Sequence, residues 1–568
     1  MLDVVIRGGE VVDGTGSARR QADVGILDGQ VVQVGEVTDS ARRTIDAEGK
    51  IVAPGFIDVH THYDIQAFWD PLLSPSPLHG VTTVLGGNCG FSVAPIDSES
   101  SDYMMRTLAR VEGMPLEALE SGAPWDWKST AEYLDALDGT LALNAGFMVG
   151  HTAIRRVVMG EDATTRFSTP DELEAMATLL RQGLRAGGMG FSTSRGRAHQ
   201  DANGDAVPSR HASAEEFVAL AAICRDYPGT SIEFIPHHSP FSDEDRDIAL
   251  SMTVAAQRPI NWNLIIANAA NLDSDLLALE LSDEAAARGG KIVALAIPMD
   301  VSGRLTFATG FALDMIPGWT KNMVKPAPER LALLRDPATR ERMKAQAKIP
   351  GAHTDLADWG QKIIVTVLNP KLKHYEGRIV ADIAAEEGKD PFDALLDIVC
   401  ADELATTFSR LPKDSRADWE ARAKIWRDER TLIGGSDAGA HLDFLATFQY
   451  ATTLLSSGVR DHEVFTLEEA VEQITSRPAD LYGLRDRGRL IPGTRADVVI
   501  FDETQVASGP TVTRNDLPGG AARFYAEAIG VDEVMVNGET VVAACEFTGA
   551  RPGTLLRSGK DTMTPSLS

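Results

Sequence analysis

Residues 53–64 read APGFIDVHTHYD, and this stretch decides the fold. An apolar run of strand-forming residues ends in His60-Thr61-His62, and the two-residue spacing puts both imidazoles on one face of the strand. Two such histidines can chelate one metal ion. Working outward, we expect seven more short apolar strands, which begin near Val81, Leu143, Gly188, Thr230, Pro259, Lys291 and Thr431.

Helical stretches separate several of these strands, which is typical of a parallel sheet with crossover helices. PDELEAMATLLRQGLRAG (170–187) and SAEEFVALAAICRDY (213–227) are examples, and each is opened by a capping Ser or Thr. Eight alternating units favour an α/β fold of the (β/α)8 TIM-like barrel type over a doubly wound sheet. Active sites of that barrel collect at the carboxyl ends of its strands, where His60 and His62 lie.

The two chain ends follow another pattern. Residues 1–54 and 485–556 consist of short β-rich runs divided by Gly and Asp turns, so we expect one small β-sandwich formed by both ends. The metal-dependent barrel then takes residues 55–484. An insertion at about 300–430 is too long for one crossover and is expected to shape the substrate pocket over the barrel mouth.

Composition excludes several classes of protein. The net charge of −28 disfavours binding to nucleic acid or to anionic lipid. The four cysteines show no CxxC pairing, which argues against a disulfide framework and fits a reducing compartment. No basic leader with an apolar stretch is present, and no apolar run approaches the ~20 residues of a membrane helix. We expect a soluble, cytoplasmic protein that acts on a small-molecule substrate, with neither nucleic acid nor membrane as partner.

Two further residues extend the candidate metal site. Asp437 in GGSDAGAH ends the last strand, where an acid can bind metal and accept a proton from water; its alternative role is a helix cap. Cys89 in GGNCGFS follows the second strand between glycines, and a thiolate is a good zinc donor. The alternative for Cys89 is an inert buried thiol.

These segments, together with SPSPLHGVTTVLGGNCGFSVAPI, GHTAIRRVVMG and DRGRLIPGTRADVVIFD, resemble the N-acyl-D-amino-acid deacylases, a branch of the amidohydrolase superfamily. The resemblance spans nearly the whole chain. It implies a (β/α)8 barrel with a β-sandwich, one or two zinc ions, and a small symmetric homo-oligomer. By position, His60 and His62 match the histidine pair on the first strand of the family, Cys89 matches its thiolate ligand, and Asp437 matches its last-strand acid.

The chain departs from this family on the fifth and sixth strands, where the deacylases supply one histidine each. The fifth strand carries Glu233, and His237 or His238 follows it, so either kind of side chain could replace the missing ligand. The sixth carries Asn261 and Asn263, which are weak zinc ligands but suit hydrogen bonding to a substrate carbonyl. A single, differently composed metal site is expected.

A second departure concerns the substrate carboxylate. The deacylases carry an arginine shortly after the last-strand acid, and none follows Asp437 here. Arg195, Arg197 or Arg210, on the loop after the fourth strand, could hold a carboxylate instead, or be plain solvated charge. His441 is expected to orient Asp437 or contact substrate, with simple loop structure as its alternative.

One more histidine is a catalytic candidate. His151 ends the third strand in VGHTA and matches a histidine of the family, so we expect it to polarise the scissile carbonyl or hold the oxyanion; core packing is its alternative. His199 has no supporting context and is interpreted as a surface residue.

The function predicted from these residues is metal-dependent hydrolysis of the amide C–N bond of a small N-acyl substrate, a non-peptide bond. Hydrolysis of a cyclic amide, a carbamate or an ester at the same site is the alternative within enzymes. A catalytically inactive barrel scaffold is the alternative from another class, because the fifth- and sixth-strand histidines are lost. Retention of the HxH pair, Cys89 and Asp437 favours the enzyme.

Overall fold

The computed structural model describes residues 1–237, 241–350 and 355–567, and a strand is present at each of the eight predicted positions. The strand predictions are therefore confirmed. The strands are β6 (Phe56–Asp58), β7 (Val81–Gly86), β8 (Asn144–Phe147) with β9 (Val149–Gly150), β10 (Gly190–Ser194), β11 (Ser231–Ile235), β12 (Ile260–Ile265), β13 (Ile292–Ala296) and β17 (Thr431–Ile433).

These strands pair in parallel, each with its neighbours in the chain. One sheet has the order β17-β13-β12-β11-β10-β9, and a second has the order β6-β7-β8. Only Met148 separates β8 from β9. Beyond β6, the amide of Asp437 donates to the carbonyl of His60 at 3.0 Å, and the amide of His62 donates to the carbonyl of Ala438 at 2.7 Å. Backbone contacts thus bring the carboxyl ends of β6 and β17 together.

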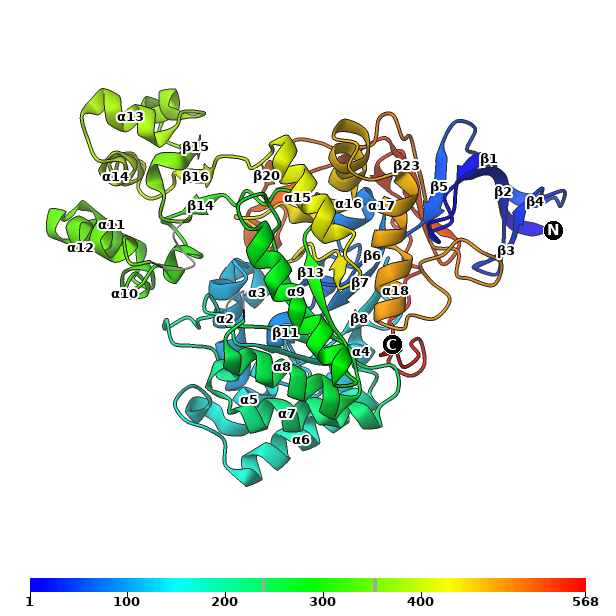
Figure 1. Cartoon of the computed structure of the whole chain (residues 1–568), viewed down its shortest axis with the longest axis horizontal. Coiled ribbons are helices and arrows are strands. Elements are labelled where there is room, and N and C mark those ends of the chain that lie inside the picture. The colour runs from blue at the N-terminus through cyan, green and yellow to red at the C-terminus, as the bar shows by residue number, and fades with distance from the viewer. Residues whose placement is uncertain (238–240, 351–354, 568) are drawn as a thin grey trace.

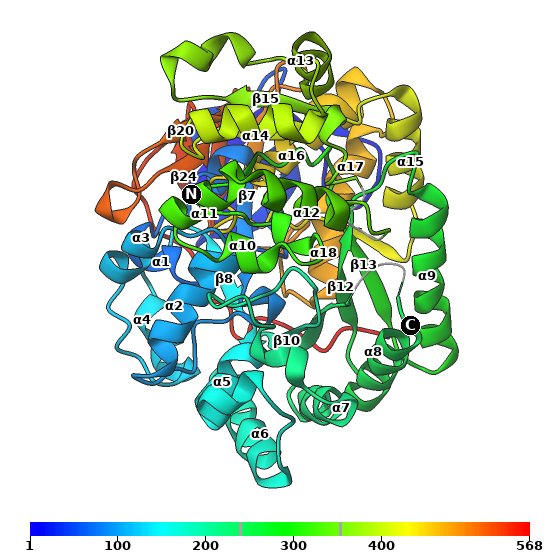
Figure 2. The same cartoon turned by 90° about the vertical axis from the view of Figure 1, so that its left-hand side faces the viewer.

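Helices cover the outside of these strands. Capping residues in the sequence mark where several of these helices begin. In α6 (Pro170–Arg185), Thr169 and Glu172 form a capping box before a proline at the first position. Ser213 caps α7 (Ala214–Ile223) by accepting a hydrogen bond from the amide of Glu216. Figure 2 shows α7, α8 (Asp243–Ala256) and α9 (Leu272–Ala287) around the outside of β10, β12 and β13. Among the described helices, none has both the length and the apolar character needed to cross a lipid bilayer.

Residues from both chain ends build one nine-stranded sheet, which lies at the right of Figure 1. Its central contact is an antiparallel pairing of β18 with β5, the strand just before β6. This pairing fixes the start of β6 and hence the position of His60. The strands are β1 (Leu2–Val11), β2 (Arg20–Leu27), β3 (Gln30–Gly35), β4 (Ala41–Asp46), β5 (Ile51–Pro54), β18 (Val498–Phe501), β23 (Val531–Val536), β24 (Glu539–Ala543) and β25 (Glu546–Phe547).

The insertion between β13 and β17 forms a body with its own apolar core, built around Phe307, Trp319 and Phe408. It projects from the strands in Figure 1 and lies in front of them in Figure 2. The rings of Phe311 and His441 lie 4.6 Å apart between centroids, so the insertion reaches the region beside Asp437. Its elements are β14 (Leu305–Thr306), β15 (Lys362–Thr366), β16 (Thr407–Arg410), α10 (Thr320–Met323), α11 (Ala327–Arg335), α12 (Pro337–Ala347), α13 (Val380–Glu387) and α14 (Pro391–Ala401).

Candidate metal centre and active site

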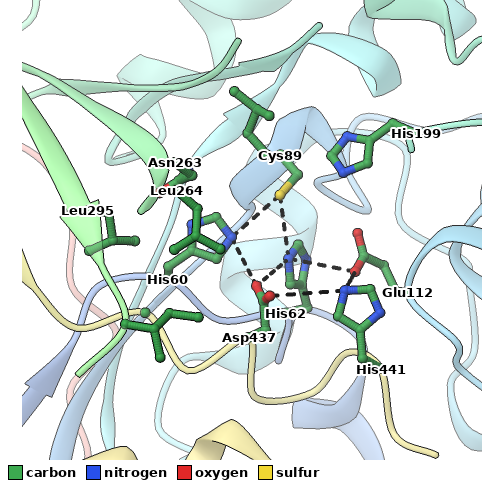
Figure 3. A pocket seen from close by; sticks show the side chains of 13 residues that line it. His60, His62, Cys89, Glu112, His199, Asn263, Leu264, Leu295, Asp437 and His441 are labelled. Carbon is green, nitrogen blue, oxygen red and sulfur yellow. Dashed lines mark hydrogen bonds and ion pairs between the residues drawn. The ribbon is translucent and has the colours of Figure 1, made fainter. Parts of the chain in front are cut away.

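Two histidines and a cysteine converge beyond the carboxyl ends of β6 and β7. Cys89 Sγ lies 3.4 Å from His60 Nε2 and 3.7 Å from His62 Nε2. One donor atom from each of the three residues falls within 4.8 Å of the others, and all three residues are buried. Figure 3 shows the two rings and the thiol facing one point. The structure therefore brings together three residues that the sequence singled out for a metal site.

Asp437 faces the same point from the end of β17. Its Oδ1 lies 3.2 Å from His60 Nε2 and 3.6 Å from His62 Nε2. Burial alone would raise the pKa of Asp437. The hydrogen bond from His60 and the charges of His60, His441 and His62 outweigh burial and hold this pKa well below its usual range. The carboxylate is therefore ionised at neutral pH, and it can bind a cation or accept a proton.

The donor set fits a divalent transition metal. A thiolate, two imidazoles and a carboxylate are the ligand types of zinc sites. Burial, followed by the charges of Glu233, Glu112 and Asp437, raises the pKa of the Cys89 thiol well above its usual value. A cation at the centre would compensate for a thiolate there and reverse this effect. Without a cation, a thiolate at Cys89 is disfavoured by burial and by the neighbouring carboxylates. The donor set therefore fits a bound metal ion.

Left-handed backbone at three positions shapes the site. The φ angles are 57° at Cys89, 53° at Asp437 and 50° at His441. Each such residue costs roughly 1–2 kcal/mol, and strain of this kind clusters at functional sites. The loop of Cys89 also packs tightly against Gly150, where an added Cβ would lie 2.6 Å from the carbonyl oxygen of Gly90. Glycine at 150 therefore allows this loop to take its position.

A cavity of about 190 Å³ opens onto the cluster. One part of its lining is apolar and the rest is polar, as the labelled side chains in Figure 3 indicate. Such a cavity can hold a small substrate with its acyl chain against the apolar wall. Besides His60, His62, Cys89 and Asp437, the lining consists of Glu112, His199, Ile235, Asn263, Leu264, Leu295, Ile297, Gly435 and His441.

Glu233 and Asn263 stand on β11 and β12, where the family supplies histidines. Glu233 accepts a hydrogen bond from the amide of Cys89 at 3.0 Å and another from the side-chain amide of Asn263. Burial raises the pKa of Glu233 to about 7. Within the described residues, Glu233 is not part of the convergent group, and its contacts position Cys89 instead. Asn263 lines the cavity, but its donor is already engaged.

His151 lies apart from this cluster. Its two ring nitrogens contact Thr193 Oγ1 at 2.8 Å and Glu216 Oε1 at 2.9 Å, and the side chain is fully buried. It does not belong to the described lining of the cavity. Because both nitrogens are engaged elsewhere, the geometry gives no support to the expected role in holding the oxyanion.

Arg195 and His237 are not brought to the cavity either. Arg195 forms ion pairs with Glu244 and Asp245 at 2.8 and 2.7 Å, so the loop after β10 directs it toward the start of α8. His237 is half-buried beyond β11 and belongs to neither the convergent group nor the lining that the structure describes. His238 lies outside the described residues.

Glu112 and His199 line the cavity although the sequence did not single them out for it. Glu112 follows α2 (Ser100–Val111), and its Oε2 lies 3.8 Å from His62 Nε2 and 3.7 Å from His441 Nε2. Burial raises the pKa of Glu112 well above its usual range. His199 contacts Ser194 Oγ at 2.6 Å, which corrects its interpretation as a surface residue. Its place on the loop after β10 was the available signal.

Comparison with known proteins shows the family of the chain and several similar proteins. A model of the amidohydrolase family matches residues 43–542. An N-acyl-D-glutamate deacylase of Alcaligenes xylosoxydans xylosoxydans is 30% identical over 579 residues, which cover 98% of this chain and 96% of the relative. The D-aminoacylase of the same organism is 28% identical over 568 residues, covering 98% and 97%. The structure of the N-acyl-D-glutamate deacylase of Bordetella bronchiseptica, complexed with zinc and a phosphonate inhibitor, is similar with a TM-score of 0.66 at 27% identity, covering 98% of this chain and all of the other.

Proposed function

The chain belongs to the amidohydrolase family, and from this premise we propose that it is a metal-dependent hydrolase that cleaves the amide C–N bond of a small N-acyl substrate, as N-acyl-D-amino-acid deacylases do. The observation that carries the proposal is the convergence of His60, His62 and Cys89 on one point of a cavity. Asp437 Oδ1 lies 3.2 Å from His60 Nε2 at the same place. The deacylases of Alcaligenes, similar over nearly the whole chain, support it.

For the metal, we propose a single zinc ion held by His60, His62, Cys89 and Asp437. Zinc is favoured by the mixed sulfur, nitrogen and oxygen donors, and the zinc complex of the Bordetella relative supports it. One ion is proposed because Glu233 and Asn263 replace the histidines of the fifth and sixth strands. When bound, the ion supplies Lewis-acid chemistry, which polarises an acyl carbonyl and makes water more acidic.

Asp437 is the residue placed to move the proton. Its carboxylate stays ionised, so it can accept the proton of a water whose oxygen adds to the scissile carbonyl carbon. It then returns this proton to the nitrogen as the C–N bond breaks, which releases an amine and a carboxylic acid. Asn263 Oδ1 is buried without a partner among the described groups and can accept the substrate N–H. His441, 4.0 Å from Asp437 Oδ2, lies on the cavity side of the acid.

We also propose that the eight parallel strands form a (β/α)8 barrel over residues 55–484, and that residues 1–54 and 485–556 form a β-sandwich. The parallel pairings, the contact between β6 and β17 and the nine-stranded sheet support this division. The four cysteines are free, which supports a reducing compartment, the cytoplasm. A small symmetric homo-oligomer is proposed from the family resemblance alone.

An assay of amine release tests the proposed function. Zinc-loaded protein is incubated with N-acetyl amino acids of both configurations, a cyclic amide, a carbamate and an ester. We expect turnover of N-acyl substrates that a chelator abolishes and added zinc restores. Cys89→Ala should be inactive, whereas Cys545→Ala, which changes a half-buried free cysteine outside the site, should behave as wild type. Turnover of only the ester or the cyclic amide would contradict the proposal.

A further inference from the structure

In the part of the chain that the structure describes, the active-site cavity is lined by histidines but by no lysine or arginine. The same lining includes the carboxylates of Glu112 and Asp437. The residues at 238–240, 351–354 and 568 are not lysine or arginine either. A carboxylate on the carbon next to the scissile nitrogen would lie beside these acids. Close to the scissile nitrogen, the described lining therefore offers a substrate carboxylate no lysine or arginine to pair with.

A second cavity, of about 210 Å³, is lined in part by the loop that also supplies His199 to the first cavity. Arg197, Gln200 and Arg210 line it from the loop after β10, and residues 314–318 and Thr320 line it from the insertion. His199 belongs to the lining of the first cavity, and the next residue, Gln200, belongs to the lining of the second. The guanidinium of Arg210 donates to the carbonyl of His199 at 3.1 Å. Residues 197–210 of this loop therefore contribute to the lining of both cavities.

The two arginines of the second cavity are not neutralised. Within the described part of the chain, no carboxylate forms an ion pair with Arg197 or Arg210, although acidic residues outnumber basic ones by 82 to 54. Among the described residues, the guanidinium of Arg210 donates to the backbone carbonyls of Arg197 and His199. Burial, followed by the charges of Arg197 and Arg195, lowers the pKa of Arg210 to about 10. Arg197, which is exposed, and Arg210, which is half-buried, thus carry like charges without a counter-charge among the described residues.

The one carboxylate in the described lining of the second cavity is engaged with another arginine. Asp314 lines the second cavity and forms an ion pair with Arg110 of α2. Arg195, by contrast with its two neighbours, is paired with Glu244 and Asp245. The uncompensated positive charge is therefore confined to Arg197 and Arg210, where it faces the cavity.

We propose that Arg197 and Arg210 form a subsite for a carboxylate that the substrate carries several bonds away from the cleaved amide. The proposal rests on the proposed function. Guanidinium groups bind carboxylates through paired, charge-assisted hydrogen bonds. An α-carboxylate is too close to the scissile nitrogen to leave the first cavity, whereas an acidic group at the end of a short chain can reach the second. The favoured substrate class is an N-acyl amine whose acidic group ends such a chain.

Three acetyl amides that differ in the presence of a carboxylate and in its distance from the amide test this subsite. They are N-acetylglycine, 4-acetamidobutanoate and N-butylacetamide, assayed with the zinc-loaded full-length protein. We expect the highest kcat/KM for 4-acetamidobutanoate. Arg197→Ala should lower that value by about 10- to 100-fold and leave the value for N-butylacetamide unchanged. Arg185→Ala, at an exposed arginine that ends α6, is the matched control and should change neither.

The outcomes separate the subsite from the proposed function. Equal kcat/KM for the three amides, or no effect of Arg197→Ala on 4-acetamidobutanoate, would overturn the subsite and leave amide hydrolysis standing. If no amide is turned over, the subsite is tested by calorimetry, which compares the binding of 4-acetamidobutanoate to wild type and to Arg197→Ala. Weaker binding by Arg197→Ala would then support the subsite while the proposed function falls. Absent binding, or binding that this substitution leaves unchanged, would overturn both.

Discussion

Replacing Glu216 tests the buried ion cluster beneath the active site. The Glu216 side chain is 1% exposed and accepts hydrogen bonds from Arg155 at 2.6 Å and from His151 at 2.9 Å. Glu216→Gln keeps the volume of the side chain but leaves the fully buried charge of Arg155 without a counter-charge. Removing one partner of a buried ion pair costs about 3–5 kcal/mol. We expect the free energy of unfolding at pH 7 to fall by this amount.

The pH dependence of the free energy of unfolding gives a second value for the contribution of ionised Glu216. Burial alone would raise the pKa of Glu216, but His151, Arg155 and Ser168 together lower it from 4.5 to about 2. Because the folded pKa lies below the unfolded one, this contribution to stability is complete above about pH 4.5. It is lost as the pH falls toward 2. The difference between the two pKa values corresponds to about 3 kcal/mol, which agrees with the cost of breaking the pair.

Urea unfolding followed by tryptophan fluorescence, from pH 7 down to about 3, measures both effects. The difference between wild type and Glu216→Gln should be largest at pH 7 and should shrink as the pH falls. Glu215→Gln, one residue earlier on α7 and exposed, is the control and should match wild type. Equal stability of wild type and Glu216→Gln at pH 7, or a difference that does not change with pH, would refute the reasoning.

Three further predictions concern the site itself. Asp437→Asn should lower kcat by about 100- to 10,000-fold, because the proton acceptor is lost while the volume of the side chain is kept; turnover near the wild-type rate would remove Asp437 from this role. Gly150→Ala should weaken zinc binding in a chelator competition, because the new Cβ would displace the backbone at Gly90 beside Cys89. Gly360→Ala should leave zinc binding unchanged, because an added Cβ there would have no neighbouring atom closer than 3.7 Å. Equal zinc affinities of Gly150→Ala and Gly360→Ala would contradict the argument. Chelation should lower the Tm of wild type, since a ligand bound only by the folded state stabilises it, and Cys89→Ala should show no such shift; a chelator-insensitive Tm in wild type would count against a metal in the folded protein.

The eight strands and the convergent cluster could be predicted because their signals are local. Each strand is a short apolar run, and His60, His62 and Asp437 lie at the ends of such runs, where a parallel arrangement brings side chains together. The glycines around Cys89 mark a close approach of backbone that the contact with Gly150 bears out. These residues needed no knowledge of distant partners.

The misplaced residues depend on contacts that no local pattern encodes. Arg195 turns away from the cavity because Glu244 and Asp245, far along the chain, form ion pairs with it. His151 ends its strand as expected, but the carboxylate of Glu216 engages its ring from α7. Glu112 reaches the cavity from the irregular segment after α2, whose position is set by packing. Periodicity carries no information about such a segment.

The most direct test of the central claim is the metal content of protein purified without chelators. Elemental analysis would compare wild type with His60→Ala and Cys89→Ala, and with Cys545→Ala as control. The account predicts about one zinc ion per chain in wild type and in Cys545→Ala, and loss of zinc in the other two variants. Absence of metal from wild type under every loading condition would contradict it.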